Sequence, residues 1–255
     1  MPRLTPPPEA HITEAYGVHI LGVAHREVRR LRRTSDPIAH GTRAWGASYL
    51  LMDYLREQPV KKGATVLEVG CGWAPAGIFC AKQFGAKVIG TDIDDKVFPY
   101  MEAMAALNGV AIEARVRSFQ TLTKRDLTGV NTVIGSDICF WNNLIEPLYG
   151  LVQRSLQAGV QRVVLTDPGR APFHKLCDVI ANSHVPSGTK VPQAALLHAL
   201  KEAGWTDCGR VATSEYQTKK QIYADPDVAK RLTKSEMRRM IENVSPNGET
   251  KVKTT

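Results

Sequence analysis

An acidic residue and two glycines stand where an apolar run of the sequence ends. The segment 66–75 reads VLEVGCGWAP, with Glu68 inside the apolar run and Gly70 and Gly72 directly after it. Glycines in such a turn permit backbone angles that other residues avoid and let a ligand approach the main chain. In open α/β sheets, ligands bind where a strand passes through such a turn into a helix. We therefore expect Glu68, Gly70, Gly72 and the neighbouring Trp73 to belong to a cofactor site.

The residue types of this segment discriminate between classes of ligand. A dinucleotide-binding turn needs Gly-x-Gly-x-x-Gly, but counting from Gly70 the last position is Pro75. A P-loop needs Gly-Lys-Ser/Thr, which does not follow either. The carboxylate of Glu68 would repel a pyrophosphate and suits a cation instead. S-adenosylmethionine carries a sulfonium and an ammonium group, so the segment favours it as the cofactor.

A second acidic position follows the next apolar run, where residues 88–94 read VIGTDID. Asp92 follows Gly72 at about the spacing at which an acid meets ribose hydroxyls in such folds. We expect Asp92 to bind these hydroxyls, Ile93 to pack on the adenine face and Ser118, after a third strand, to lie near the adenine edge. For Asp94 we expect a helix cap.

Asp137 follows a further apolar run and precedes two aromatic residues, in the segment GSDICFWNN at 135–143. Residues at the carboxyl end of a central strand face the ligand crevice. We expect Asp137 to accept a hydrogen bond from an incoming amine, and Phe140 and Trp141 to favour a cationic group through cation–π contact. Alternatively, Asp137 caps a helix and the aromatic residues belong to the core. No metal is expected, because the candidate ligands do not cluster and a sulfonium methyl needs no Lewis acid.

Strands and helices must alternate along the chain to position these residues. Short apolar, β-branched runs predict five strands, at 65–69, 87–91, 114–117, 132–136 and 162–166. Helical patterns are found at 76–84, 96–108, 119–127 and 144–157. This alternation predicts an α/β fold, a mostly parallel Rossmann-like sheet with helices on both faces.

Flanking segments extend this core at both ends. We expect a Pro-rich arm and a helix up to about Arg33, then an amphipathic helix over 42–58. After a helix near 191–203, runs at 206–214 and 217–224 predict an antiparallel strand pair. The predicted organisation is a helical N-terminal lid or cap at 1–58, a cofactor-binding domain at 59–225 and a basic helix and tail at 226–255.

Charge and cysteine content limit the class of protein. The net charge is +8, and one basic cluster follows i, i+3, i+4, i+7 spacing at Arg26, Arg29, Arg30 and Arg33. A second cluster lies at 230–239. These clusters are either solvated helix faces or a surface for an acidic partner, protein or RNA. The five cysteines are odd in number and widely spaced, which predicts reduced, mostly buried thiols. Without a long apolar run, no membrane partner is expected and the cytoplasm is the default location.

The turn at 68–72, Asp92 and the order of strands resemble the class I methyltransferases, with Ala74 where their common pattern has a third glycine. Three segments are similar to a lysine methyltransferase family that includes the enzyme acting on the electron-transfer flavoprotein β-subunit. They are Asp137-x-x-Phe140, Trp45 in GTRAW at 41–45, and TDPGR at 166–170. The resemblance implies S-adenosylmethionine as cofactor, a protein lysine as acceptor, and cofactor contacts by Trp45 and Asp137.

Other functions stay open at this point. The main alternative is methylation of a small-molecule amine, with the N-terminal arm as a lid. RNA methylation is less favoured, because SDIC at 136–139 stands where an Asn-Pro-Pro-aromatic signature would favour base or amide nitrogens. A non-catalytic cofactor-binding scaffold is a further alternative. Arg170 either binds an acidic group of the substrate or pairs with Asp167 or a helix end.

Overall fold

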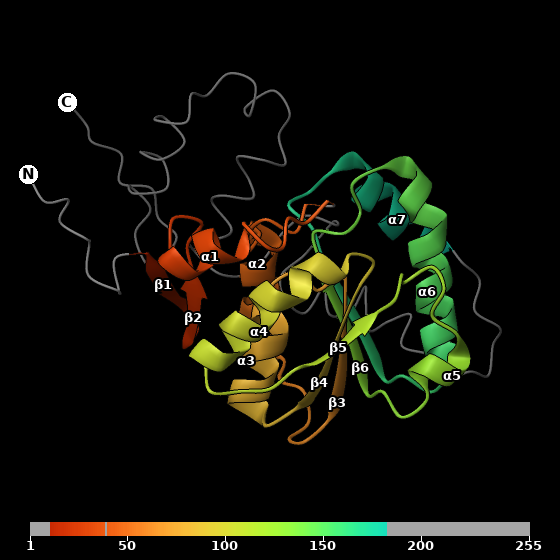
Figure 1. Cartoon of the computed structure of the whole chain (residues 1–255). Coiled ribbons are helices and arrows are strands. Elements are labelled where there is room, and N and C mark those ends of the chain that lie inside the picture. Colours follow the sequence, from red (N-terminus) through yellow and green to blue (C-terminus); the bar gives the residue numbers. More distant parts are fainter. Residues whose placement is uncertain (1–10, 39, 183–255) are drawn as a thin grey trace, which may run out of the picture. The chain divides into compact units, whose positions relative to one another are not determined.

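The computed structural model describes residues 11–38 and 40–182 (Figure 1). The chain divides into two compact units. Of the described residues, the first unit holds 11–38, 40–138 and 150–166, and the second holds 139–149 and 167–182. The strand pair and helix expected beyond residue 190, and the second basic cluster, lie outside the described residues.

Five parallel strands form the sheet of the first unit, in the order β5-β4-β3-β6-β7. Their bounds are β3 Thr65–Val69, β4 Lys87–Asp92, β5 Glu113–Val116, β6 Thr132–Ser136 and β7 Arg162–Thr166. The predicted mostly parallel, Rossmann-like sheet is confirmed. Since all five strands run in the same direction, their carboxyl ends lie at one edge.

Helices cover this sheet on both faces (Figure 1). One face carries α2 Gly46–Glu57, α3 Pro75–Phe84 and α4 Phe98–Leu107. The short helix η1 Asp95–Val97 directly precedes α4. The other face carries α5 Lys124–Leu127 and the later part of α6 Ile145–Gln157. The second unit contains α7 Ala171–Asn182, which the sequence analysis did not predict. The core includes Leu51, Ile78, Met104 and Ile134. No helix in the described part of the chain is long and apolar enough to cross a membrane.

The helix expected over 119–127 begins only at Lys124. Thr123 caps it, because its side chain accepts from the N–H of Asp126 while the Asp126 carboxylate accepts from the N–H of Thr123. The Thr121 hydroxyl donates to the carbonyl of Ser118, which keeps the preceding segment in a turn. Side-chain hydrogen bonds thus compete with the helical backbone pattern here.

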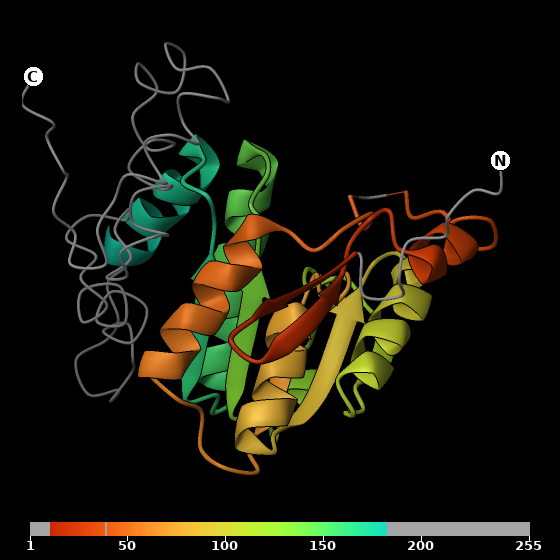
Figure 2. The same cartoon turned by 90° about the vertical axis from the view of Figure 1, so that its left-hand side faces the viewer.

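Of the helix expected up to about Arg33, the structure contains the short helix α1 Arg26–Leu31, and the segment before it forms a hairpin. In this antiparallel hairpin, β1 Ile12–Ala15 pairs with β2 Val18–Leu21 (Figure 2). Tyr16 and Gly17 both have positive φ, 55° and 76°. This conformation makes a two-residue turn that matches the twist of paired strands, so the segment before α1 forms a hairpin.

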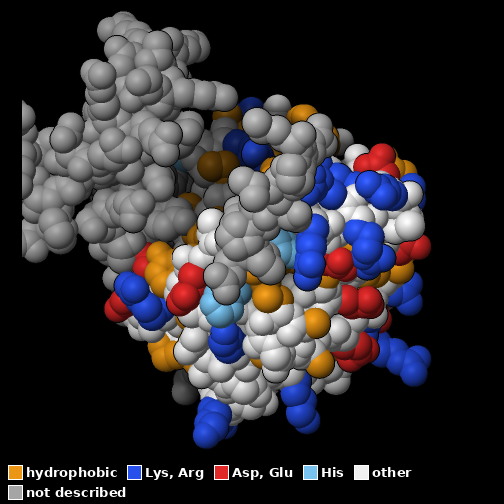
Figure 3. All heavy atoms as spheres, turned by 60° about the vertical axis from the view of Figure 1, so that its left-hand side comes forward, with side chains coloured by type: hydrophobic (Ala, Val, Ile, Leu, Met, Phe, Trp, Pro, Cys, Tyr) orange, Lys and Arg blue, Asp and Glu red, His pale blue; other side chains and the backbone are white. Residues whose placement is uncertain are grey.

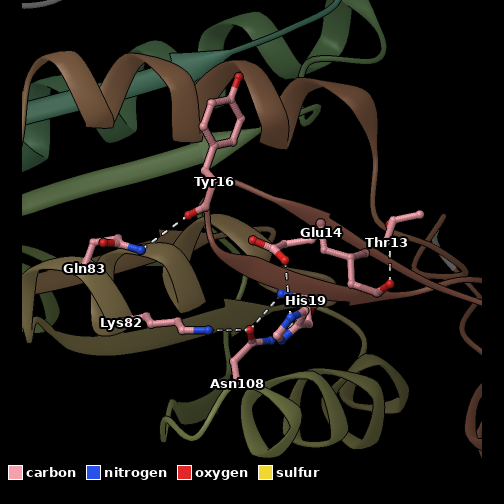
Figure 4. Close-up of polar contacts among 8 residues, drawn as sticks. Thr13, Glu14, Tyr16, His19, Lys82, Gln83 and Asn108 are labelled. Atoms are coloured by element: carbon pink, nitrogen blue, oxygen red, sulfur yellow. Dashed lines mark hydrogen bonds and ion pairs between the residues drawn. The ribbon is translucent and has the colours of Figure 1, made fainter. Parts of the chain in front are cut away.

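The hairpin is fastened to the helices beside it by Asn108, the residue after α4 (Figure 4). The Asn108 Oδ1 atom accepts from the backbone N–H of His19 at 2.8 Å, and Nδ2 donates to the carbonyl of His19 at 2.8 Å. Nδ2 also donates to the carbonyl of Met104 at 2.9 Å, and Lys82 Nζ donates to Oδ1 at 3.4 Å. The side-chain amide therefore pairs with β2 as a neighbouring strand would.

The four cysteines in the described residues are free and buried, as predicted: Cys71, Cys80, Cys139 and Cys177. Cys208 lies outside the described residues.

Candidate functional site

Three residues of the turn after β3 have a left-handed backbone conformation. Gly70, Gly72 and Ala74 have φ of 59°, 51° and 51°. A Cβ atom on Gly70 would lie 2.6 Å from Cγ2 of Ile138, whereas one on Gly72 would meet no atom within 4 Å. A side chain at position 70 would therefore clash with Ile138, whereas the space beside Gly72 is open. Ala74 adopts the left-handed conformation although it carries a Cβ, which costs about 1 kcal/mol.

Glu68 is buried beneath this turn, with 1% of its surface exposed. Its Oε2 accepts from the backbone N–H of Gly77 at 2.8 Å, in the first turn of α3. A Cβ on Gly77 would overlap Oε2 of Glu68. Burial raises the pKa of Glu68 to about 8. The hydrogen bond from the backbone N–H of Gly77 lowers this pKa, whereas the negative charge of Asp92 raises it further. The carboxyl group therefore holds a proton near neutral pH, unless a cation binds beside it.

Gly77 was not among the predicted site residues. Its only sequence signal is a glycine inside the first turn of a helix, where glycine is unfavourable. The structure supplies the reason, which is the space needed by the Glu68 carboxyl group.

Asp92, at the end of β4, holds the turn in place. Its Oδ2 accepts from the N–H of Gly72 at 3.0 Å and its Oδ1 from the N–H of Asp94 at 3.1 Å. Burial raises the pKa of Asp92, and the backbone donors at Asp94, Gly72 and Ile93 oppose the shift. Ile93, by contrast, is 69% exposed. The carboxyl group of Asp92 and the exposed side chain of Ile93 thus follow one another at the end of β4.

Asp94 and Ser118 flank this position. The Asp94 side chain accepts from the N–H of Lys96 and caps η1, as predicted. Ser118 is half-buried, and its hydroxyl accepts from the N–H of Gln120 at 3.2 Å. The Arg117 N–H donates to the carbonyl of Asp92 at 2.8 Å, which brings the end of β5 next to the end of β4.

Asp137 directly follows β6 and is buried. Its φ of 61° lies in the left-handed region, which aspartate tolerates better than most residues. Its N–H donates to the carbonyl of Thr166 at 2.8 Å. The strand therefore ends at Asp137, at the same edge of the sheet as Gly70, Gly72 and Asp92.

The two tryptophans predicted to contact the cofactor have packing partners within the protein. The Trp73 indole is 1% exposed, stacks on Tyr100 at 5.2 Å between ring centroids and donates to the carbonyl of Gly41 at 2.8 Å. The side chain of Trp73 is therefore part of the core and does not line an open site. Trp45 precedes α2 and donates from Nε1 to the carbonyl of His40, and Arg43 lies 4.1 Å from its ring centroid.

In the second unit, Asp167 organises the Asp-Pro-Gly-Arg turn. Its carboxylate accepts from the N–H groups of Gly169 and Arg170 at 2.9 and 2.7 Å, and pairs with the Arg170 guanidinium at 2.7 Å. The guanidinium also lies over the Phe140 ring, 4.8 Å from its centroid. Phe140 and Trp141 are neighbours with ring centroids 5.6 Å apart, and Trp141 is 59% exposed. Of the two roles considered for Arg170, pairing with Asp167 is observed.

Among the residues that the structure describes, no three His, Cys, Asp or Glu side chains lie close enough together to bind a metal ion.

The order of the parallel strands and the family match place the chain in the class I methyltransferase fold. Within that class, the chain belongs to the family described as lysine methyltransferase, whose model matches residues 30–170, more than half of the chain.

Similar proteins carry related names. The ribosomal protein L11 methyltransferase of Dictyoglomus turgidum (strain DSM 6724 / Z-1310) is 31% identical over 173 residues, covering 66% of this chain and 52% of that protein. The electron transfer flavoprotein beta subunit lysine methyltransferase of Xenopus laevis is 26% identical over 132 residues, 51% of this chain and 52% of that protein. The chain thus spans about half the length of the curated relatives it matches.

Among solved structures, the tRNA (uracil-54, C5)-methyltransferase of Pyrococcus abyssi in complex with S-adenosyl-L-homocysteine is similar with a TM-score of 0.46 and 18% identity. The match covers 69% of this chain and 38% of that chain.

Proposed function

We propose that this protein is an S-adenosylmethionine-dependent methyltransferase that methylates a nitrogen nucleophile, and that its acceptor is a lysine of a protein. The observation that carries the proposal is the position of Asp137, at the same sheet edge as Gly72 and Asp92. The printed names of the similar proteins support a protein acceptor, since one specifies a lysine of the electron transfer flavoprotein beta subunit and another specifies ribosomal protein L11.

The cofactor would occupy the open space beside Gly72. S-adenosylmethionine supplies a methyl group that its sulfonium already activates. Asp92 would accept hydrogen bonds from the ribose hydroxyls while it keeps its bond to the N–H of Gly72, because each carboxylate oxygen has two lone pairs. The exposed side chain of Ile93 would cover one face of the adenine, and Ser118 would lie near its edge. Buried Glu68 would face the positive end of the cofactor.

Asp137 would position the acceptor amine. A lysine ammonium has no lone pair and must lose its proton before it can accept a methyl group. Partial removal from water lowers the pKa of an amine and helps this loss. A nearby carboxylate favours the ammonium instead, so we assign Asp137 a role in orientation and not in deprotonation. Correct orientation of a nucleophile contributes a large part of the rate in such reactions.

Of the two aromatic residues, we propose Trp141 as the one that contacts a cationic acceptor. One face of the Phe140 ring already carries the guanidinium of Arg170. Trp141 is largely exposed and belongs to the residue type that gives the strongest cation–π contacts. Phe140 would then support the turn at Asp167 and Arg170.

The test of the proposal is the Asp137→Asn variant, which keeps the shape of the side chain and removes its charge. We expect nearly unchanged affinity for S-adenosylmethionine by calorimetry, and about 100-fold slower transfer of labelled methyl groups to protein in cell extract. Asp95→Asn, at an exposed position, is the matched control. Label that enters only small molecules or only RNA would contradict the lysine acceptor. Inhibition by a chelator that one divalent ion reverses would contradict our expectation that no metal takes part.

A further inference from the structure

Helix α1 has two faces of opposite character. Val28 and Leu31 are 1% and 6% exposed and belong to the hydrophobic core. The opposite face carries the exposed Arg26, Arg29 and Arg30, and the exposed Arg33 lies in the turn directly after the helix; we call these four residues the arginine face. Figure 3 shows Lys and Arg side chains gathered over this region. Because the apolar face of α1 is buried in the core, the orientation of the arginine face is fixed.

The charges of the arginine face are poorly compensated. Glu27 binds Arg30 through Oε1 and Oε2 at 2.7 and 3.0 Å. Within the described chain, Arg26, Arg29 and Arg33 form no ion pair. Like charges four residues apart on a helix repel each other. An acidic partner would remove this repulsion and gain attraction at the same time.

A strap formed by residues 35–38 and 40–41 joins the arginine face to the cofactor site. The Ser35 carbonyl accepts from the Tyr100 hydroxyl at 2.6 Å, and its hydroxyl donates to the carbonyl of Lys96 at 2.9 Å. The N–H of Ile38 donates to Asp94 Oδ2 at 2.6 Å. The carbonyl of Gly41 accepts from Trp73, within the glycine turn. The arginine face is thus held in fixed register with the turn that we assign to the cofactor.

We propose that the arginine face docks an acidic α-helix of the protein substrate, an inference that rests on the proposed function. From Arg26 to Arg33, helix α1 and the turn after it cover about 10 Å. A second helix presents four carboxylates over the same length when acidic residues follow the same spacing, and guanidinium groups bind carboxylates with two hydrogen bonds. Single-stranded RNA is the poorer fit, because no aromatic side chain for base stacking interrupts residues 26–33. The substrate would then carry acidic helical residues at a fixed distance from its target lysine.

Binding of synthetic peptides to the full chain tests this surface without any methyl transfer. The probe is a fluorescent helical peptide with glutamates at i, i+3, i+4 and i+7, and its glutamine counterpart and a uridine 12-mer are the comparisons. We expect Arg29→Glu/Arg33→Glu to weaken binding of the glutamate peptide about tenfold, and Arg29→Lys/Arg33→Lys to keep most of it. Lys61→Glu/Lys62→Glu changes the net charge equally at other exposed positions and should weaken binding less than twofold.

The outcomes separate this inference from the proposed function. Equal losses in the two charge-reversal variants, or no loss in either, would overturn docking at α1. Binding of the uridine 12-mer that exceeds binding of the peptide, and that is lost in Arg29→Glu/Arg33→Glu, would assign the face to RNA instead. Normal docking without label in any protein would contradict the lysine acceptor alone, while label in protein with unchanged peptide binding would contradict the docking site alone. Circular dichroism of each variant checks that the fold is retained.

Discussion

The buried carboxyl group of Glu68 lies against the backbone of Gly77, where a larger residue would leave it no room. The N–H of Gly77 donates to Oε2 of Glu68 at 2.8 Å, and a Cβ on residue 77 would overlap that oxygen. A buried acid under the cofactor turn is therefore held by the first turn of the helix that follows the turn. This pair explains how a carboxyl group that is 1% exposed keeps a hydrogen-bond partner.

The stability of the cofactor-free protein should depend on pH through Glu68. Burial raises its folded-state pKa to about 8, while an unfolded glutamate titrates near ~4.3. Between these values the folded state binds more protons than the unfolded state, so the free energy of unfolding falls as pH rises, by at most ~1.4 kcal/mol per pH unit. Glu68→Gln should flatten this slope. Thermal unfolding from pH 5 to 9 measures it, and equal slopes in both proteins would refute the assignment.

Gly72→Ala should reduce cofactor affinity more than it reduces stability. Its Cβ meets no atom of the protein within 4 Å, so the cost for folding is the left-handed backbone alone, about 1 kcal/mol. Gly63→Ala is the matched control, because Gly63 also has positive φ and open space around it. Calorimetry with S-adenosylmethionine should show weaker binding only for Gly72→Ala. Similar affinity in the two variants would mean that the cofactor does not approach Gly72.

Asp92→Ala should weaken the binding of S-adenosylmethionine by about 1.5–3 kcal/mol for each charge-assisted hydrogen bond lost. Part of the loss would come from the N–H of Gly72, which would lose its hydrogen bond to the Asp92 carboxylate. Asp95→Ala serves as the control, since Asp95 is exposed. Unchanged affinity in calorimetry would remove Asp92 from the ribose role. Tight binding of a nicotinamide dinucleotide by the wild-type protein would contradict the cofactor assignment.

Trp141→Ala should lower the incorporation of labelled methyl groups into extract protein at limiting acceptor, because an aromatic face for the amine is lost. Trp141→Phe should retain most of the incorporation. Neither change should alter thermal stability much, since the side chain is largely exposed. Equal incorporation by all three proteins would show that the acceptor does not contact Trp141.

Asn108→Ala should destabilise the protein by about 2–3 kcal/mol, because the N–H and carbonyl groups of His19 lose their side-chain partner in a partly buried place. Thermal unfolding measures this loss. Gln83→Ala removes a single long hydrogen bond, 3.4 Å to the carbonyl of Tyr16, and should cost less than about 0.5 kcal/mol. If both variants were equally stable, the hairpin would not depend on Asn108 for its attachment.

The sequence by itself determined the alternation of strands and helices and the positions of the acidic and glycine residues. Strands β3, β6 and β7 have the predicted bounds, because continuous apolar, β-branched runs form strands buried on both faces. The turn at Gly70 and Gly72 and the cap by Asp94 were also predictable, since local backbone and hydrogen-bonding preferences fix them. The family resemblance likewise depended on short local motifs.

Only the tertiary structure decided which side chains are available. Trp73 lies in the cofactor turn, yet its indole stacks on Tyr100 of helix α4 and is buried. The hairpin at residues 12–21 was not predicted, and Asn108, about ninety residues later, pairs with its second strand. Gly77 acquired its role from the Glu68 carboxyl group of the preceding strand. Such contacts join residues of different secondary-structure elements, and local patterns of polarity do not record which partner a side chain will meet.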